Sequence, residues 1–414
     1  MPAAPPVSFL VSRFPNPSET FIQAQAEGLL ERGLPVEIVA LAAGDPNVLG
    51  ALLLKWPDRL KVRYAPVPKT LGARLLAAPG ALTRKGAAAT LSGRFGDDAS
   101  SLRLLIAASR WPAESRPPRV WLAHYGRWGG FACALRELGL ISGPIATVFH
   151  GKDMSAYLKK RPNAYARLFQ QGDLFLPISE VWREKLLALG APAGRTLVHR
   201  MGVDTARFTE TPRSLAPGDP VRFIGVGRMV EKKGFDDALA AFAAARALPG
   251  APAATLMLIG DGPLREKLQA RAVDLKLGES VRFTGLLPHA RVAEELRAAH
   301  LFVLPSKTAA SGDMEGIPVA LMEAMAQGLP VLATRHSGTP ELVEHEVSGL
   351  LCDEGDWRAL AANMDALART PARWAAMGAA GAAKARKDFD LKVWNDILAQ
   401  RLNLLYSASG GAPT

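Results

Sequence analysis

Val221-Arg-Phe-Ile-Gly-Val-Gly-Arg-Met-Val-Glu-Lys-Lys-Gly234 is the stretch of sequence from which the fold can be worked out. Residues 221–226 are mostly apolar, as in a buried parallel strand, and the glycines that follow end the strand. A helical pattern occupies 235–248, and an apolar run at 255–259 predicts another strand. Strand, helix and strand in this order predict an α/β fold with a mostly parallel, doubly wound sheet.

The same alternation extends through the rest of the chain. In the second half, further strands are predicted at 281–284, 301–304 and 330–333. In the first half, strands are predicted at 7–11, 36–41, 120–123, 145–149 and 174–178, with helices that begin near Ser18 and Ser179. We therefore expect two doubly wound domains that face a central cleft.

A linker separates the two predicted domains. Residues 204–220 contain three prolines and little apolar periodicity, which is typical of a connection between domains. We expect a first domain over 1–205, a linker over 206–220 and a second domain over 221–389. A C-terminal helix at about 390–414 is expected to pack back onto the first domain.

Composition excludes several classes of protein. The 414 residues are 49% hydrophobic, which is enough to build a core in each domain and excludes a disordered or fibrous chain. Cys133 and Cys352 have no CxxC spacing, so neither a zinc site nor a disulfide framework is suggested, and a cytoplasmic setting fits best. The N-terminus lacks a secretory signal pattern, and no apolar stretch reaches the ~20 residues of a spanning helix. A soluble or peripheral protein is expected.

The loop after the strand at 221–226 offers two cations, Arg228 and Lys233, just before a helix. Exposed N–H groups and the helix dipole favour an anion there, and the two cations suit a diphosphate. The alternative is a solvated loop with incidental basic residues. The dinucleotide fingerprint GxGxxG fails, because Val230 stands where the third glycine would be.

A second pattern is Glu315-Gly-Ile-Pro-Val-Ala-Leu-Met-Glu-Ala-Met-Ala-Gln-Gly-Leu-Pro330. It predicts a helix over about 318–327, with Glu315 in the loop before the helix and Glu323 inside it. At the carboxyl ends of parallel strands, two such carboxylates can accept hydrogen bonds from sugar and ribose hydroxyls. The alternative is an ordinary amphipathic helix with a surface glutamate.

The combination resembles a known family. Arg228 and Lys233 after a Gly-x-Gly turn, followed by a Glu-x7-Glu helix, resemble family 4 of the retaining, nucleotide-sugar-dependent glycosyltransferases with the GT-B fold. The resemblance extends to Phe149-His-Gly151, Gly260-Asp-Gly-Pro263, Val281-Arg-Phe-Thr-Gly285 and Ser337-Gly-Thr-Pro-Glu341. It implies two Rossmann-like domains and a nucleoside-diphosphate-sugar donor, UDP- or GDP-linked, with no resident cofactor and no metal.

The resemblance also implies roles for individual residues. Arg228 and Lys233 would hold the donor diphosphate, Glu315 the transferred sugar and Glu323 the ribose. The rest of the donor would be bordered by Gly227, Gly260, Phe283, Gly285, Gly316, Ile317 and Pro318. His150 matches the family's histidine that reaches the transferred sugar; a buried histidine at a strand end is the alternative.

The N-terminal loop departs from the commoner pattern of the family. In place of a Gly-Gly pair it carries Ser12-Arg-Phe-Pro-Asn-Pro-Ser-Glu-Thr-Phe21, which is similar to the branch of colanic-acid and other exopolysaccharide glycosyltransferases. Ser18, Glu19 and Thr20 stand at a predicted helix N-terminus, where they can address the acceptor or the donor phosphate, and with His124 they are expected to form an acceptor-side loop. For Glu19, an acidic residue favoured by the helix dipole is the alternative. A glycan or lipid-linked acceptor is expected.

The net charge of +11 is concentrated in one segment. Residues 55–119 carry 13 basic and 4 acidic side chains, a net +9. Patterns of nucleic-acid-binding folds are absent and aromatic residues are sparse, so no nucleic-acid partner is expected. Contact with an anionic membrane surface is the sharper hypothesis, because 71–78 and 102–110 can form short helices with apolar and basic faces. A solvated basic face is the alternative.

Asp388-Phe-Asp390 spells the DxD pattern that chelates a metal in another glycosyltransferase class, but it follows a helical stretch, and a helix boundary is favoured. The competing functions are a nucleotide-sugar epimerase or other non-transferase enzyme of the same fold, and a non-catalytic sugar- or lipid-binding scaffold.

Overall fold

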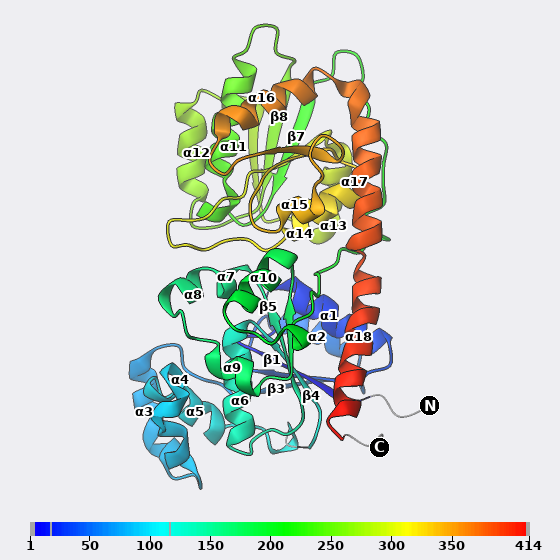
Figure 1. The fold of residues 1–414 in the computed structure, drawn as a ribbon. Helices are drawn as coiled ribbons and strands as arrows, with labels where there is room; N and C mark the ends of the chain where they lie inside the picture. Colours follow the sequence, from blue (N-terminus) through cyan, green and yellow to red (C-terminus); the bar gives the residue numbers. More distant parts are fainter. Residues whose placement is uncertain (1–4, 17–18, 116, 411–414) are drawn as a thin grey trace.

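The computed structural model describes residues 5–16, 19–115 and 117–410. The chain forms two six-stranded sheets, and every strand pairing within them is parallel (Figure 1). The first sheet has the order β3-β2-β1-β4-β5-β6, with β1 Val7–Val11, β2 Val36–Ala40, β3 Leu60–Tyr64, β4 Val120–His124, β5 Ile145–Phe149 and β6 Leu174–Pro177. The second has the order β12-β11-β10-β7-β8-β9, with β7 Val221–Val226, β8 Ala254–Ile259, β9 Val281–Gly285, β10 Leu301–Leu304, β11 Val331–Thr334 and β12 Gly349–Cys352.

These sheets confirm the α/β class, and they add two strands that the sequence did not predict. Both are edge strands, β3 and β12. Strand β3 alternates apolar residues with Lys61 and Arg63, since its outer side needs no apolar partner, and β12 is only four residues long. Weak apolar patterns of this kind are typical of sheet edges.

Helices cover both faces of each sheet (Figure 1). In the first domain they are α1 Thr20–Glu31, α2 Pro46–Lys55, α3 Leu71–Leu82, α4 Asp97–Ser100, α5 Arg103–Ser109, α6 Gly126–Glu137, α7 Gly151–Met154, α8 Ala156–Lys160, α9 Ala166–Gln171 and α10 Glu180–Ala188. The second domain contributes α11 Phe235–Arg246, α12 Arg265–Asp274, α13 His289–Ala298, α14 Val319–Ala326, α15 Thr339–Leu342, α16 Trp357–Ala368 and α17 Trp374–Asp388. The last helix, α18 Leu391–Ala408, follows directly.

Helix α18 returns to the first domain and packs beside α1 (Figure 1). A Cβ atom on Gly28 of α1 would lie 1.9 Å from the amide nitrogen of Asn395, so only glycine permits this close approach. The Arg32 guanidinium donates to Asp396 at 2.5 Å. Asp390 accepts hydrogen bonds from the N–H groups of Lys392 and Val393, so the Asp388-Phe-Asp390 run is a helix junction.

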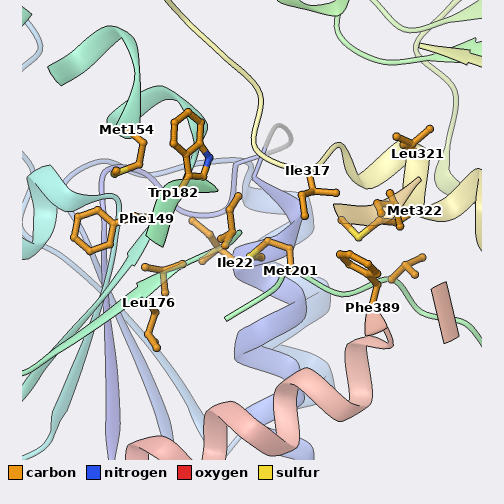
Figure 2. Packing of buried hydrophobic residues seen from close by; sticks show 14 of the residues in the cluster. Ile22, Phe149, Met154, Leu176, Trp182, Met201, Ile317, Leu321, Met322 and Phe389 are labelled. Atoms are coloured by element: carbon orange, nitrogen blue, oxygen red, sulfur yellow. The ribbon is translucent and has the colours of Figure 1, made fainter. Parts of the chain in front are cut away.

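Buried apolar residues form one cluster that continues from the first domain into the second. Figure 2 shows Ile22, Trp182 and Met201 on one side of the boundary and Ile317 and Met322 on the other. Each domain therefore contributes apolar side chains to a shared contact, which fixes how the residues at the carboxyl ends of the two sheets face each other.

Candidate functional site

Glycines line the carboxyl ends of β7, β8 and β9. The Gly227 N–H donates to the Ile259 carbonyl at 3.0 Å, and the Gly260 N–H donates to the Gly285 carbonyl at 2.9 Å. A Cβ on Gly260, whose φ is +138°, would lie 1.9 Å from the Gly227 carbonyl oxygen. A side chain is therefore excluded at Gly260, and the backbones of the three strand ends come close together.

The two predicted cations follow this edge. Arg228 is exposed, and within the described part of the chain no hydrogen bond or ion pair engages its side chain. Lys233 ends the short 3₁₀ turn Glu231–Lys233, and its aliphatic stem passes over Gly227, where an added Cβ would lie 3.3 Å from the Lys233 Cε. Gly227 thus leaves room for the lysine that crosses it.

Glu315 is the counter-ion of Lys233. The Lys233 Nζ lies 3.2 Å from Glu315 Oε2, and the Lys232 Nζ lies 3.4 Å from Oε1. Burial alone would raise the pKa of Glu315, but the two ammonium groups outweigh it and hold the pKa below its ordinary value. Lys232 also pairs with Asp313 at 3.3 Å, a contact that the sequence did not predict. A buried, ionised carboxylate therefore stands among cations.

A histidine that the sequence analysis missed holds the Glu315 loop. The Glu315 N–H donates to His336 Nε2 at 3.0 Å, which requires the proton of this imidazole to be on Nδ1. That Nδ1–H donates to Glu354 at 2.6 Å, and the second oxygen of Glu354 accepts from the Thr308 N–H at 2.7 Å. His336 directly precedes the predicted Ser337–Glu341 motif, so proximity to the motif was the available signal.

Glu323 lies on the buried face of α14, as the helix pattern predicted. Burial raises the pKa of Glu323 to about 7, with Arg207 acting weakly in the opposite direction. The nearest partner is His289 Nδ1, at 4.0 Å. This carboxyl group is close to half protonated at neutral pH and has spare hydrogen-bonding capacity.

The other predicted donor-binding residues fall into two groups. Phe283 is half-buried at the end of the second sheet. Gly316, Ile317 and Pro318 are buried, and Ile317 packs against Gly338 at the boundary with the first domain. Because the side chains of Ile317 and Pro318 are covered by protein and Gly316 has none, only the backbone groups of these residues are left to meet a donor.

The loop with Glu315 touches the first domain directly. A Cβ on Gly151 would lie 2.4 Å from the Met314 carbonyl oxygen, and the Met314 N–H donates to the Ser155 hydroxyl at 3.1 Å. Gly151 follows His150, so this contact brings the predicted histidine of the first domain near the carboxylate of the second. His150 and Glu315 are thus brought together by the fold.

His150 is buried at the end of β5, and burial lowers its pKa to about 3, so the ring is neutral at pH 7. The backbone N–H of His150 donates to one carboxylate oxygen of Asp153 at 2.8 Å, and the other oxygen accepts from the backbone N–H of Gly126 at 2.7 Å. Asp153 thereby joins the loops after β4 and β5. Burial raises the pKa of Asp153 to about 7.

The placement of His124 in an acceptor-side loop was wrong. His124 is the last residue of β4 and is fully buried, because β4 is a central strand of the sheet. Its Nδ1 lies 3.3 Å from His150 Nε2, and its ring stacks on Phe9. Burial, with His150 and His199 nearby, lowers the pKa of His124 well below its ordinary value. His124 therefore supports His150 from behind.

Glu19 is the predicted acceptor-side residue with the most specific contacts. Its Oε1 accepts from the Tyr125 hydroxyl at 2.9 Å, and its buried Oε2 has no partner among the described residues. Burial raises the pKa of Glu19. Thr20 is exposed at the start of α1, and Glu19 takes the N-cap position. Ser18, which the sequence predicted as the cap, lies outside the described residues.

Tyr125 is a second residue that the sequence analysis missed. Its backbone has φ +74°, which is uncommon for a non-glycine residue, and its ring lies 4.6 Å from the His150 ring, centre to centre. Strain of this kind often accompanies functional sites. The side chain of Tyr125 therefore connects Glu19 to His150.

Over 5–16, 19–115 and 117–410, no helix is long and apolar enough to cross a membrane. In the same ranges, no three His, Cys, Asp or Glu side chains are grouped so that they could share a metal ion.

Comparisons with known proteins agree with this geometry. The family described as "Glycosyl transferases group 1" matches residues 207–384, and the "Glycosyl transferase 4-like domain" matches residues 18–202. The amylovoran biosynthesis glycosyltransferase AmsK of Erwinia amylovora is 38% identical over 96% of this chain and 99% of its own length. WcaL of Escherichia coli (strain K12), named for colanic acid biosynthesis, is 38% identical over 96% of this chain and 100% of its own.

The fold is also found among solved structures. The Anabaena protein HepE, crystallised with UDP, superposes with a TM-score of 0.70 at 18% identity, over 96% of this chain and 100% of that one. The two Rossmann-like domains, whose sheets face each other at the carboxyl ends of their strands, thus form the GT-B fold. With family matches to both halves and relatives aligned along nearly their whole length, the chain belongs to the family 4 glycosyltransferases, in the branch of the colanic acid and amylovoran enzymes.

Proposed function

We propose that this chain is a retaining glycosyltransferase that moves a hexose from a UDP- or GDP-linked sugar to a glycan or lipid-linked acceptor in exopolysaccharide synthesis. The names of AmsK and WcaL support the pathway class. The HepE structures with UDP and with UDP-glucose support a nucleotide-sugar donor for this fold. The enzyme acts at the cytoplasmic face of a membrane.

The free cation beside the glycine edge carries the proposal. Arg228 is exposed and has no ion-pair or hydrogen-bond partner among the described residues, and Lys233 is held by Glu315 at 3.2 Å, so two positive charges stand ready where the backbone of β7–β9 admits a diphosphate. As the bond to the anomeric carbon breaks, negative charge grows on the leaving phosphate. Charges already in place stabilise it without reorganisation, and losing one such group typically costs about 100- to 1,000-fold in kcat.

The remaining site residues fit a front-face transfer. The acceptor hydroxyl passes its proton to the leaving phosphate oxygen, so no nucleophilic carboxylate is needed. Glu315 binds hydroxyls of the transferred sugar, and Glu323 binds the ribose. His150, neutral because of burial, reaches the sugar from the first domain. Since the cationic pair neutralises the diphosphate, a metal ion is not required.

The acceptor meets the first domain. Glu19 offers beside Tyr125 an oxygen that has no hydrogen-bond partner among the described residues, and this domain carries the positive surplus of 55–119. Both features suit an acceptor linked to a lipid phosphate at an anionic membrane surface. No nucleic acid takes part.

The test begins with the nucleotide. Thermal-shift measurements with UDP, GDP, ADP and TDP identify the base, and hydrolysis of the matching nucleotide sugar then measures turnover. Lys233→Ala should lower that turnover by about 100-fold or more, whereas the control Lys267→Ala, an exposed lysine of α12, should not.

Other outcomes would overturn the proposal. Unchanged turnover in Lys233→Ala would refute the diphosphate role. Conversion of the sugar without release of the nucleoside diphosphate would indicate an epimerase, and nucleotide-sugar binding without turnover would indicate a scaffold.

A further inference from the structure

Helix α3 lies on the surface, but its leucines are exposed and its charged residue is buried, the opposite of the usual arrangement. Leu71 is 48% exposed, Leu75 56%, Leu76 86% and Leu82 50%. The only charged side chain of the helix, Arg74, is 5% exposed. A helix on a water-facing surface turns its charged face outward. The outer face of α3 is therefore apolar along its whole length.

The packing of α3 explains why its leucines are left outside. The helix uses small residues for its internal contacts, since Ala78 and Ala81 pack with Leu105 and Ile106 in a separate small core. Arg74 donates only to backbone carbonyls at the start of the helix. The largest apolar side chains of α3 thus lie outside the core, and their location on one exposed helix face suits a partner outside the described chain.

The neighbouring α5 does not share this surface. The sequence predicts a short helix with apolar and basic faces over 102–110 as part of the membrane hypothesis; the helix forms, but its apolar residues face inward. Leu104, Leu105 and Ile106 are buried, because α5 supplies the core on which α3 rests. Of the two helices, only α3 therefore presents its large apolar side chains outward; Leu91, in the turn between them, is a further exposed leucine at 41%.

Charges around α3 identify the kind of partner. Residues 59–96 hold eight Lys and Arg side chains and no Asp or Glu. Lys69 just before α3, and Arg84 and Lys85 just after it, are exposed. Leucines between exposed cations complement the acyl chains and phosphates of an anionic lipid surface.

The α3–α5 lobe (residues 71–109) is tied to the body of the first domain. Asp97 pairs with Arg161 at 2.5 Å, and Asp98 pairs with Arg127 at 3.4 Å. Figure 1 shows the lobe projecting on the side of the domain away from the α1–α18 pair. A surface bound by α3 would therefore be held in a defined orientation to the domain.

We infer that α3 inserts its leucines into the interfacial layer of an anionic membrane, while Lys69, Arg84 and Lys85 contact lipid phosphates. Apolar insertion adds to the charge attraction, so part of the binding resists salt. The inference rests on the proposed function in one respect only: the membrane insertion would serve to bring the enzyme to a lipid-linked acceptor. Its test uses no substrate.

The test measures binding of the full chain to vesicles of phosphatidylcholine with phosphatidylglycerol. Wild-type protein should bind at low salt and retain a bound fraction at about 1 M salt, where charge attraction is screened. Leu75→Gln/Leu76→Gln should lower the high-salt partition constant by about tenfold or more, because two exposed leucines no longer transfer into the lipid. Arg84→Glu/Lys85→Glu should lower binding mainly at low salt.

A matched control separates this surface from general hydrophobicity. Val273→Gln/Leu404→Gln changes two apolar residues that are 75% and 64% exposed on α12 and α18, and it should bind vesicles like the wild type. Nucleotide-sugar hydrolysis without vesicles should be equal in all these variants. If hydrolysis is absent from the wild type but α3-dependent binding remains, the proposed function fails and this inference stands.

Insertion depth gives a direct readout. Both cysteines are free and buried, so Leu76→Cys can be labelled selectively with a fluorophore. Brominated lipid chains should quench this label. The inference would be overturned if the label were not quenched, or if Leu75→Gln/Leu76→Gln bound vesicles at high salt as well as the wild type does. It would also be overturned if the protein formed a lipid-free dimer that Leu75→Gln/Leu76→Gln abolishes, because the partner of α3 would then be a second copy of the chain.

Discussion

The ammonium group of Lys233 lies 3.2 Å from the carboxylate of Glu315 and joins the loop after β7 to the loop before α14. The pair lies where the diphosphate is proposed to bind, so the carboxylate and the ligand compete for one cation. Glu315→Gln should therefore bind the free nucleotide more tightly, by up to about tenfold, because a negative charge near the diphosphate is lost. Turnover of the nucleotide sugar should fall, because the amide replaces one of the two carboxylate oxygens that accept hydrogen bonds from the sugar hydroxyls.

Calorimetric titration with the nucleotide selected by thermal shift measures the first effect, and donor hydrolysis the second. Glu266→Gln, an exposed residue of α12, is the control. Weaker nucleotide binding in Glu315→Gln would show that Glu315 does not oppose the diphosphate.

Gly151→Ala should separate the two domains. The added Cβ would lie 2.4 Å from the Met314 carbonyl oxygen, and backbone cannot move aside cheaply. We expect a loss of about 1–3 kcal/mol in stability and a lower kcat, because His150 moves away from Glu315. Gly130→Ala on α6, where a Cβ meets nothing within 4 Å, is the control. Wild-type kcat in Gly151→Ala would contradict the expectation.

Glu323 should make stability depend on pH. Burial raises its pKa from 4.5 to about 7, so the folded state binds its proton more tightly than the unfolded state. This contribution is fully present below about pH 4.5 and is lost as pH rises towards and through the folded pKa, by about 3 kcal/mol. Glu323→Gln should thus be more stable than the wild type at about pH 8 but not at about pH 4.5.

Urea denaturation at both pH values measures the difference between the two proteins. Asp153 and the buried histidines titrate equally in both, so their effects cancel in the comparison. A difference that is the same at both pH values would show that Glu323 does not titrate in this range.

His336→Ala should disturb the Glu315 loop. It leaves the Glu315 N–H and Glu354 without their shared partner, at a cost of about 1–3 kcal/mol in stability. The donor KM should rise more than kcat falls, because the loop that holds the sugar loses its support. Steady-state kinetics and a melting curve measure the two effects, and Glu354→Gln, which keeps an acceptor for the His336 N–H, should retain most activity.

Tyr125→Phe should separate transfer from hydrolysis. It removes the hydroxyl that donates to Glu19 at 2.9 Å but keeps the ring that packs on His150. Transfer to acceptor should fall about tenfold, the effect of one lost hydrogen bond to a charged group, while donor hydrolysis stays near the wild-type rate. Equal loss of both would place Tyr125 on the donor side.

The positions in the fold of several proposed site residues were predictable because these residues stand next to strong local signals. Arg228 and Lys233 follow a strand and precede a helix, and Glu323 lies in a helix with clear boundaries. His336 and Tyr125 escaped prediction for one reason. Glu354, the partner of His336, and Glu19, the partner of Tyr125, both lie far away in the sequence. A pattern that spans only a few residues cannot reveal such a contact.

The sequence by itself determined the two doubly wound domains and the place of the cationic loop between a strand and a helix, because apolar periodicity and glycine positions act over a few residues. Only the tertiary structure decided that His124 is buried behind His150, that Glu315 pairs with Lys233, and that the leucines of α3 face outward. Periodicity shows that a helix has an apolar side, but which side is buried depends on what the rest of the chain places against it.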